Sequence, residues 1–378
     1  MLLFYFFSLA IGICYFTLIM LFLWGWRRTS VVNRTTCSGK TIVTVVIALR
    51  NEAENIPQLT RMLKSQDYPG DLMEILFVDD HSSDTTKEAI HFYMRDETGY
   101  SVIPNSGVGK KDALLCGYKR SRGDLIITTD ADCICRKEWI SSIVSFFENE
   151  RPDLIIGPVV LNEGEGIFQD FQALEFLSLT GTSGGSSGIG RPVLCNGANL
   201  AFNKGKIIPD SEILNSRFAS GDDIFLLHGV KKTAGLKSLF LKSREAVVIS
   251  QGQPDLKSFW NQRKRWTSKS KIYRDPDSIA TAIIVYLMNL LLLLSLLLTV
   301  FMPQGILVFT GLFTAKLMAD LLFIYSVAGF FKRKYLLKYF LILQVLYFFY
   351  VSIIPIAGMT GKYSWKNRIY PSSDIPFP

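Results

Sequence analysis

The sequence contains little histidine: only 3 of its 378 residues are of this type. Cysteine is also scarce, and Cys133-x-Cys135 has neither a second cysteine pair nor a histidine cluster near it. Zinc sites need such ligands at close spacing, so the composition argues against a zinc protein. The six scattered cysteines fit a reducing compartment without disulfides.

Charge is sparse as well. Charged residues make up 20% of the chain and hydrophobic residues 49%, with a mean hydropathy of +0.25. No charge occurs between Leu2 and Trp26, a run long enough to cross the ~30 Å core of a bilayer as a helix. No basic segment precedes this run and no small-x-small site follows it, which argues against a cleaved signal peptide. We therefore expect residues 1–28 to form a transmembrane anchor.

Three further apolar blocks lie near the C-terminus, at about 279–301, 306–330 and 339–358. They predict about three transmembrane helices within 279–358, followed by a basic tail over 359–378. Three helices after a cytoplasmic domain would leave the C-terminus outside. Lys362, Lys366 and Arg368 favour the inside, so one of the blocks could instead be re-entrant or interfacial.

The long middle region is flanked by basic residues on both sides, including Arg27 and Arg28 before it and Lys264 and Arg265 after it. The positive-inside rule then places this region in the cytoplasm. The net charge of +8 fits an anionic lipid surface and a phosphate-bearing substrate. No nucleic-acid-binding motif occurs, so we expect no nucleic-acid partner.

The middle region alternates short β-branched runs with helical segments. Runs at 41–49, 74–78, 100–104 and 125–129 are typical of buried strands. This β-α-β-α order predicts an α/β fold, with a doubly wound sheet and helices on both of its faces. Ligands of such sheets bind at the carboxyl ends of the strands. The loops that start at Arg50, Asp79, Gly107 and Asp130 should therefore meet at one edge.

Three later segments lead to separate expectations. Residues 153–160 predict one more strand. The glycine and serine residues of 181–190 predict a loop, which would be either a disordered linker or a mobile lid or acceptor loop. Residues 254–271 predict an amphipathic helix on the membrane surface. Its lipid-facing residues would be Leu256, Phe259, Trp260 and Trp266.

Two carboxylates one residue apart, Asp130 and Asp132, follow the run at 125–129. At the end of a strand, both can turn toward one cation. Hard divalent cations such as Mg2+ and Mn2+ prefer carboxylate oxygens and keep positions open for phosphate. The pattern therefore indicates a metal that holds the diphosphate of a nucleotide, with a solvated turn as the alternative.

Four more segments complete a set of motifs in a fixed order. They are Val45–Glu54, which contains Glu52; the acidic loop with Asp80; Gly197-Ala198-Asn199; and Gly221-Asp222-Asp223. Gln262, Arg265 and Trp266 then form Gln-x-x-Arg-Trp just before the apolar blocks. Together with the D-x-D pair, this order resembles the membrane-bound family 2 glycosyltransferases over about residues 40–270 and the C-terminal helices. The family's Thr-Glu-Asp motif is matched only in part, with Asp223 at the position of the base.

The resemblance implies a GT-A fold over 40–250, which is a Rossmann-like mixed sheet that binds a nucleotide sugar, and an interface segment over 251–275. It implies inverting transfer from a nucleoside-diphosphate sugar, most readily a UDP-sugar, to a lipid or lipid-linked glycan, with Mg2+ or Mn2+ as cofactor. It also implies an integral protein of the bacterial inner membrane, with its catalytic domain in the cytoplasm. A processive polysaccharide synthase of the cellulose, hyaluronan or chitin type, and a non-catalytic scaffold, are the rival interpretations.

The resemblance also distributes roles among the residues. Asp130 and Asp132 hold the metal, and Asp223, with Asp222 beside it, accepts the proton of the acceptor hydroxyl. Contacts to the donor come from Asp80, Glu52, Lys110, Gln262, Arg265 and Trp266. Lys110 could equally well be a solvated residue at the start of a helix.

The block at 306–330 contains two charges, Lys316 and Asp320. They are four residues apart, so on a helix they share a face and can pair. A charge at the centre of a bilayer costs about 2.5–3.5 kcal/mol on the insertion scale, which favours pairing. The pair would be either structural or part of a polar patch along the path of a lipid acceptor.

Overall fold

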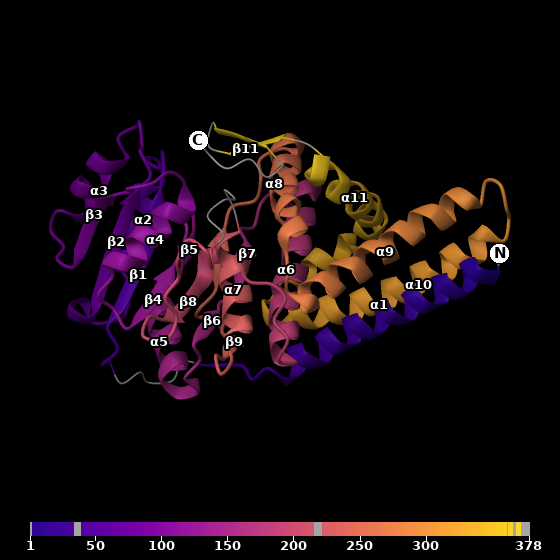
Figure 1. Cartoon of the computed structure of the whole chain (residues 1–378), viewed down its shortest axis with the longest axis horizontal. Helices are drawn as coiled ribbons and strands as arrows, with labels where there is room; N and C mark the ends of the chain where they lie inside the picture. Colours follow the sequence, from indigo (N-terminus) through magenta and orange to yellow (C-terminus); the bar gives the residue numbers. More distant parts are fainter. Residues whose placement is uncertain (1, 34–38, 215–220, 361, 366–367, 372–378) are drawn as a thin grey trace. The chain divides into compact units, whose positions relative to one another are not determined.

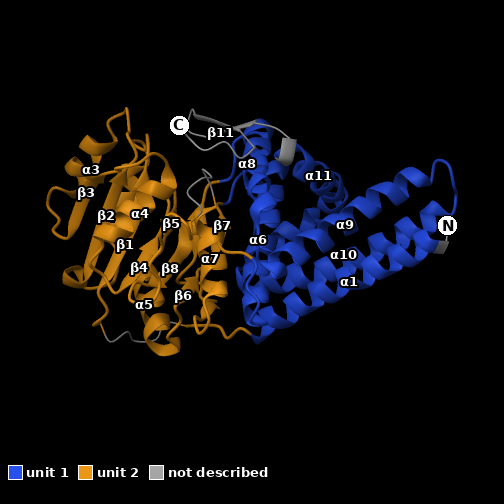
Figure 2. Ribbon diagram, viewed as in Figure 1, with its two compact units in different colours: residues 1–28, 163–193, 252–373 blue, residues 29–162, 194–251, 374–378 orange. Residues whose placement is uncertain are grey.

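The computed structural model describes residues 2–33, 39–214, 221–360, 362–365 and 368–371. Contacts divide this part of the chain into two compact units, coloured separately in Figure 2. The α/β unit comprises residues 29–162 and 194–251, and the helical unit comprises 1–28, 163–193 and 252–373. Residues 163–193, which lie inside the range expected for the catalytic domain, thus group with the helical unit. Lys366 of the expected basic tail lies outside the described residues.

A seven-stranded mixed sheet, in the order β3-β2-β1-β4-β8-β6-β9, forms the centre of the α/β unit (Figure 1). Strands β1 to β4 run parallel, and β8 pairs antiparallel with both β4 and β6. The strands are β1 (Val43–Leu49), β2 (Met73–Asp79), β3 (Tyr100–Pro104), β4 (Leu125–Thr128), β6 (Leu154–Ile156), β8 (Leu200–Asn203) and β9 (Ser238–Phe240). The four strands expected from the first β-branched runs are confirmed, as is the α/β fold class.

The helices of the α/β unit follow these strands in the expected alternation. They are α2 (Ile56–Lys64), α3 (Thr86–Met94), α4 (Lys110–Arg120), α5 (Trp139–Glu150) and α7 (Asp222–Lys232), with 3-10 turns η1 (Gly70–Leu72) and η2 (Gly197–Asn199). Helix α4 packs closely on β1, because Gly117 leaves no room for a side chain: a Cβ there would lie 2.4 Å from Val46. The fully buried side chains of β1 form the core beneath it.

A second sheet, of three strands, corrects one expectation. It contains β5 (Ile134–Cys135), β10 (Val248–Ser250) and β7 (Val159–Leu161). The single strand expected over 153–160 is wrong, because this segment breaks into β6 and β7, which belong to different sheets. Asn199 causes the break: its amide nitrogen donates to the Pro158 carbonyl at 2.9 Å, and its own carbonyl accepts from Gly157.

The helical unit contains the four helices that are long and apolar enough to cross a membrane, at Leu3–Arg28, Pro276–Leu298, Gly305–Phe330 and Lys334–Gly358. Its helices are α1 (Leu2–Arg28), α6 (Ile167–Gly188), α8 (Leu256–Ser268), α9 (Pro276–Leu298), α10 (Gly305–Phe330) and α11 (Phe340–Thr360). Shorter elements are η3 (Lys269–Ile272), η4 (Lys334–Tyr339), β11 (Lys362–Trp365) and β12 (Arg368–Pro371). Helices α1, α9 and α10 lie side by side (Figure 1).

The loop expected over 181–190 is also wrong, because residues 167–188 form the continuous helix α6. Its glycines make close contact with α1: a Cβ on Gly185 would lie 2.4 Å from the Phe22 carbonyl oxygen, and one on Gly25 would lie 2.0 Å from that of Gly185. Small residues let two helix backbones approach in this way. The packing against α1 thus outweighs the weak helical propensity of glycine and serine.

Helix α8 is confirmed as a helix, but its expected lipid-facing stripe is only partly correct. Leu256 is 70% exposed, whereas Phe259 is 4% exposed and packs on aromatic rings of α6 and α11. Arg263, a basic residue of the same helix, is also buried. The helix therefore packs into the helical unit along one face, because α6 and α11 supply apolar partners for it.

The two charges of α10 pair as expected. The Lys316 ammonium donates to the Asp320 carboxylate at 2.5 Å and to the side-chain oxygen of Gln344, on α11, at 2.5 Å. Asp320 also accepts from the Tyr15 hydroxyl, on α1, at 2.6 Å. This four-residue polar cluster joins three helices, so neither charge is left uncompensated among apolar side chains.

Candidate active site

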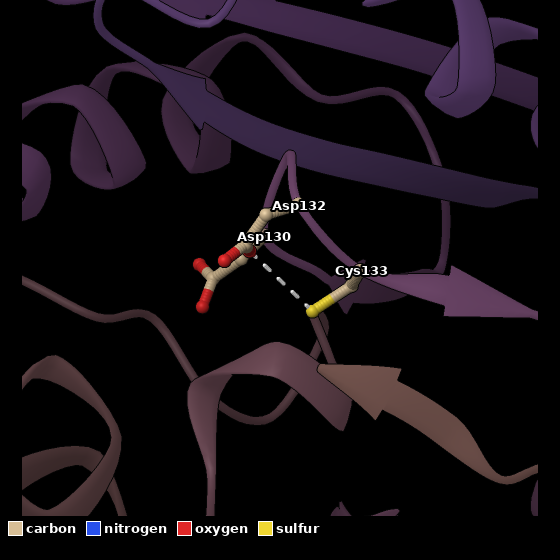
Figure 3. A group of neighbouring side chains, drawn as sticks. All are labelled: Asp130, Asp132 and Cys133. Atoms are coloured by element: carbon tan, nitrogen blue, oxygen red, sulfur yellow. Dashed lines mark hydrogen bonds between the residues drawn. The ribbon is translucent and has the colours of Figure 1, made fainter. Parts of the chain in front are cut away.

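The D-x-D carboxylates lie directly after β4, at the carboxyl end of the parallel strands. Side-chain ligand atoms of Asp130, Asp132 and Cys133 lie within 4.8 Å of one another (Figure 3). The Cys133 thiol points to Asp132 Oδ1 at 3.8 Å. Two carboxylates at this separation form a donor set that suits a hard divalent cation, and the thiol adds a softer donor beside them.

The charge around these carboxylates also suits a cation. Burial and the negative charges of Asp130 and Glu52 raise the pKa of Asp132 above its ordinary value. Glu52, in the loop after β1, is held there by its backbone N–H, which donates to the Thr86 hydroxyl at 2.9 Å. The D-x-D group and Glu52 thus share one region of negative potential.

Lys110, the first residue of α4, connects two of the predicted groups. Its Nζ donates to Asp130 at 2.6 Å and lies 3.8 Å from Asp222. Burial by itself lowers the pKa of Lys110, but the Asp130 and Asp222 carboxylates outweigh this effect, so the pKa lies above its usual value. Lys110 therefore stays protonated and places a fixed positive charge between the two carboxylates.

The acidic pair at the start of α7 lies beside the Gly-Ala-Asn segment. Gly221 precedes it with a φ of 90°, a backbone conformation that favours glycine. Asp223 accepts from the Gly197 N–H at 3.3 Å and from the Ile224 N–H at 2.8 Å. Because Thr128 Oγ1, at the end of β4, donates to the Gly197 carbonyl at 2.8 Å, η2 connects α7 to the D-x-D strand.

Asp80, after β2, is buried and holds the loop that leads into α4. Its Oδ1 accepts from the side chain of Asn105 and from the Gly109 N–H, each at 2.8 Å. Gly109, the residue before Lys110, has a φ of 99°. Asn105 and Gly109 were not among the predicted site residues, although the two glycines of their loop, Gly107 and Gly109, are visible in the sequence.

The Gln-x-x-Arg-Trp residues belong to the helical unit, whereas all the groups above belong to the α/β unit. Gln262, Arg265 and Trp266 lie on α8, and the Trp266 ring packs 6.2 Å from that of Phe176, on α6. Sequence reasoning missed Arg263, which lies within the motif and is 2% exposed. No local signal distinguishes it, because Lys264 and Arg265 beside it are also basic.

The family model "Glycosyl transferase family 2" matches residues 44–191. The model "Glycosyl transferase family group 2" matches residues 125–353, which is more than half of the chain. The probable glycosyltransferase YdaM of Bacillus subtilis is 26% identical over 234 residues, covering 59% of this chain and 54% of that protein.

A second curated relative is the undecaprenyl-phosphate 4-deoxy-4-formamido-L-arabinose transferase of Salmonella paratyphi B. It is 32% identical over 130 residues, covering 34% of this chain and 39% of the relative. The chain thus spans about half or less of the length of these curated relatives.

Among solved structures, the mannosyltransferase PcManGT from Pyrobaculum calidifontis, in complex with GDP-Man and Mn2+, has a similar fold. The TM-score is 0.56 at 16% identity, and the match covers 92% of this chain and 97% of the other. At this level of identity the likeness concerns the fold, and it extends over almost the full length of both chains.

Proposed function

Because the chain belongs to the family 2 glycosyltransferases, we propose that it transfers a sugar from a nucleoside-diphosphate sugar to a lipid or lipid-linked glycan, with inversion at the anomeric carbon. The donor site faces the cytoplasm, and the four apolar helices hold the protein in the membrane. The lipid class of the acceptor is suggested by the relative that uses undecaprenyl phosphate.

One observation carries the proposal: three groups that carry charges of opposite sign meet at the carboxyl ends of the strands. The D-x-D pair, Lys110 and the acidic start of α7 come from three separate loops, yet Lys110 contacts both Asp130 and Asp222. In open α/β sheets this edge is where ligands bind. A donor diphosphate needs positive charge there, and an acceptor hydroxyl needs a base.

Each charged residue of the site has its own role in the proposed reaction. Asp130 and Asp132 would hold a divalent cation, Mg2+ or Mn2+, which would neutralise charge on the diphosphate as its bond to the sugar breaks. Lys110 contributes a second positive charge to the same oxygens. Asp223 takes the proton of the acceptor hydroxyl, which attacks from the face opposite the leaving diphosphate. A base in this position contributes typically ~10²–10⁴-fold in rate.

The remaining predicted residues bind the two substrates. Asp80 and Glu52 lie after β2 and β1, and we assign them to the nucleoside part of the donor, with a UDP-sugar as the first candidate. We assign Gln262, Arg265 and Trp266 of α8 to the diphosphate and the acceptor: the planar guanidinium of Arg265 suits a phosphate, and the ring of Trp266 supplies an apolar wall.

The decisive experiment is a donor screen. The purified full-length protein in detergent is given UDP- and GDP-linked sugars with Mn2+ or Mg2+, and release of the nucleotide is measured. At least one donor should be hydrolysed in a metal-dependent way. No release from any donor, together with no transfer of radiolabelled sugar to membrane lipids, would contradict the proposal.

Asp132→Asn should abolish both hydrolysis and transfer, because the amide is a poorer ligand for a hard cation than the carboxylate. Expression and membrane insertion should be unchanged, since asparagine has almost the same size and shape as aspartate. Binding of Mn2+, followed by electron paramagnetic resonance, gives a second measurement. Full turnover in the variant, or in wild type with excess chelator, would rule out the metal site.

A further inference from the structure

A buried ion pair in the helical unit lies within the Gln-x-x-Arg-Trp motif. The side chains of Arg263, on α8, and Glu175, on α6, are only 3% and 6% exposed. Arg263 donates through Nη2 to Glu175 Oε2 at 2.5 Å and through Nε to Oε1 at 3.2 Å. This two-pronged geometry is the strongest and most directional arrangement that an arginine and a carboxylate can form.

The same guanidinium lies between two rings of its own helix. Its carbon lies 4.3 Å from the centroid of the Phe259 ring and 4.2 Å from that of Trp266. Phe259 lies four residues before Arg263 and Trp266 lies three residues after it, so the three side chains share one face of α8 and form a stack. Cations attract aromatic faces, most strongly that of tryptophan, and desolvation increases the effect.

The stack restrains two of the three motif side chains. Arg263 Nη1 donates to the side-chain oxygen of Gln262, and the Trp266 ring packs between Arg263 and Phe176. Glu175 fixes the guanidinium from α6, and Phe259 contacts Phe168 and Phe171 of the same helix. The orientation of Gln262 and Trp266 thus depends on Arg263, which occupies the first x position of the Gln-x-x-Arg-Trp motif.

We propose that Arg263, anchored by Glu175, is a positioning residue that sets the orientation of Trp266 and Gln262 for sugar transfer. The inference rests on the proposed function, in which these two residues contact the substrates. A lysine cannot replace Arg263, because a compact ammonium cannot reach Glu175 with two hydrogen bonds, donate to Gln262 and fill the gap between two rings.

The test uses the full-length protein with 5-fluorotryptophan at its six tryptophans. The variant Trp266→Phe assigns the Trp266 signal in the ¹⁹F spectrum. Arg263→Lys and Glu175→Gln should each shift or broaden that signal and lower transfer at least tenfold, while Mn2+ binding to the α/β unit keeps its affinity. Lys257→Gln, at an exposed position of the same helix, serves as the control and should match wild type in all three measurements.

Two results would overturn the inference. One is a wild-type Trp266 signal and a wild-type rate in both variants; the other is a shifted signal with an unchanged rate, which would make the stack purely structural. If Arg263→Lys does not fold, the Glu175→Gln variant alone tests the inference, because glutamine keeps the shape of the glutamate side chain and loses only its charge. Failure of the proposed function looks different, because the wild-type protein itself would then neither hydrolyse a donor nor transfer a sugar.

Discussion

Asp222 and Asp223 are neighbours in sequence, but their surroundings differ. Asp222 lies 3.8 Å from the Lys110 ammonium and is only 13% exposed in its side chain. Asp223 accepts from the Gly197 N–H of η2, the turn formed by the Gly-Ala-Asn segment. The ion pair suits a carboxylate that holds the Lys110 side chain in place. The position of Asp223 suits a base that exchanges a proton with the acceptor.

Asp223→Asn should therefore lower the transfer rate at least about a hundredfold with little change in donor affinity, because the carboxylate acts on the acceptor proton. Asp222→Asn should be milder and should act mainly on donor binding, through Lys110. Steady-state kinetics with varied donor measure both effects. The opposite order of severity would assign the base to Asp222, a shift of one residue in the partial match to the family motif.

At the scale of elements, α6 and α1 approach more closely than side chains would permit. Gly185→Ala would bring a Cβ to within 2.4 Å of the Phe22 carbonyl oxygen, so the backbones must move apart. Overpacking of this kind costs typically about 1–3 kcal/mol. We expect a lower melting temperature in detergent.

Gly311→Ala is the matched control for this change. Gly311 also lies in a long apolar helix, but nothing lies within 4 Å of a Cβ there. Alanine should be neutral or stabilising at this position, by up to about 1 kcal/mol, because it favours the helix. Equal melting temperatures for Gly185→Ala and Gly311→Ala would show that the packing of α6 on α1 does not require glycine at position 185.

The polar cluster that joins α1, α10 and α11 permits a second test of how the helices are held together. Lys316→Asp alone places two carboxylates together and should destabilise the protein by about 3–5 kcal/mol, because a buried charge loses its partner. Adding Asp320→Lys restores opposite charges, so the double variant should recover most of the stability and the activity. Melting temperature, donor hydrolysis and transfer are measured on each variant.

The double variant also separates the two interpretations of the cluster. A structural pair keeps all three properties after the swap. A protein that folds and hydrolyses donor but no longer transfers the sugar would instead place Lys316 and Asp320 on the path of the acceptor.

At the scale of the whole molecule, the four apolar helices and the basic residues beside them predict a membrane topology. If the α/β unit is cytoplasmic, a cysteine introduced at Asn149 should react with a membrane-impermeant thiol reagent only after the membrane is opened. A cysteine at Gln304, between α9 and α10, should react in intact cells. Both positions are exposed, so access to the reagent is not limited by folding. Labelling of the cysteine at position 149 in sealed cells would show that the α/β unit lies outside the cytoplasm.

The sequence by itself determined the elements whose signals are local. The β-branched runs of β1, β2 and β4, the carboxylates after β4, and the lengths of the four apolar helices all follow from composition and period within one segment. The burial of these strands and the convergence of their loops at one edge follow from the rules of parallel sheets. The α/β fold could therefore be predicted without knowledge of any long-range contact, and the structure confirms it.

Only the tertiary structure decided features that depend on a distant partner. Residues 181–188 are helical because α1 offers glycine and backbone to pack against, and the strand at 153–160 breaks because Asn199 binds its carbonyl. Arg263 is distinguished from its basic neighbours because Glu175, 88 residues away, supplies a buried countercharge. In the first two cases, local preference is worth only a few tenths of a kcal/mol to about 1 kcal/mol per residue, so close packing and hydrogen bonds to a distant segment outweigh it.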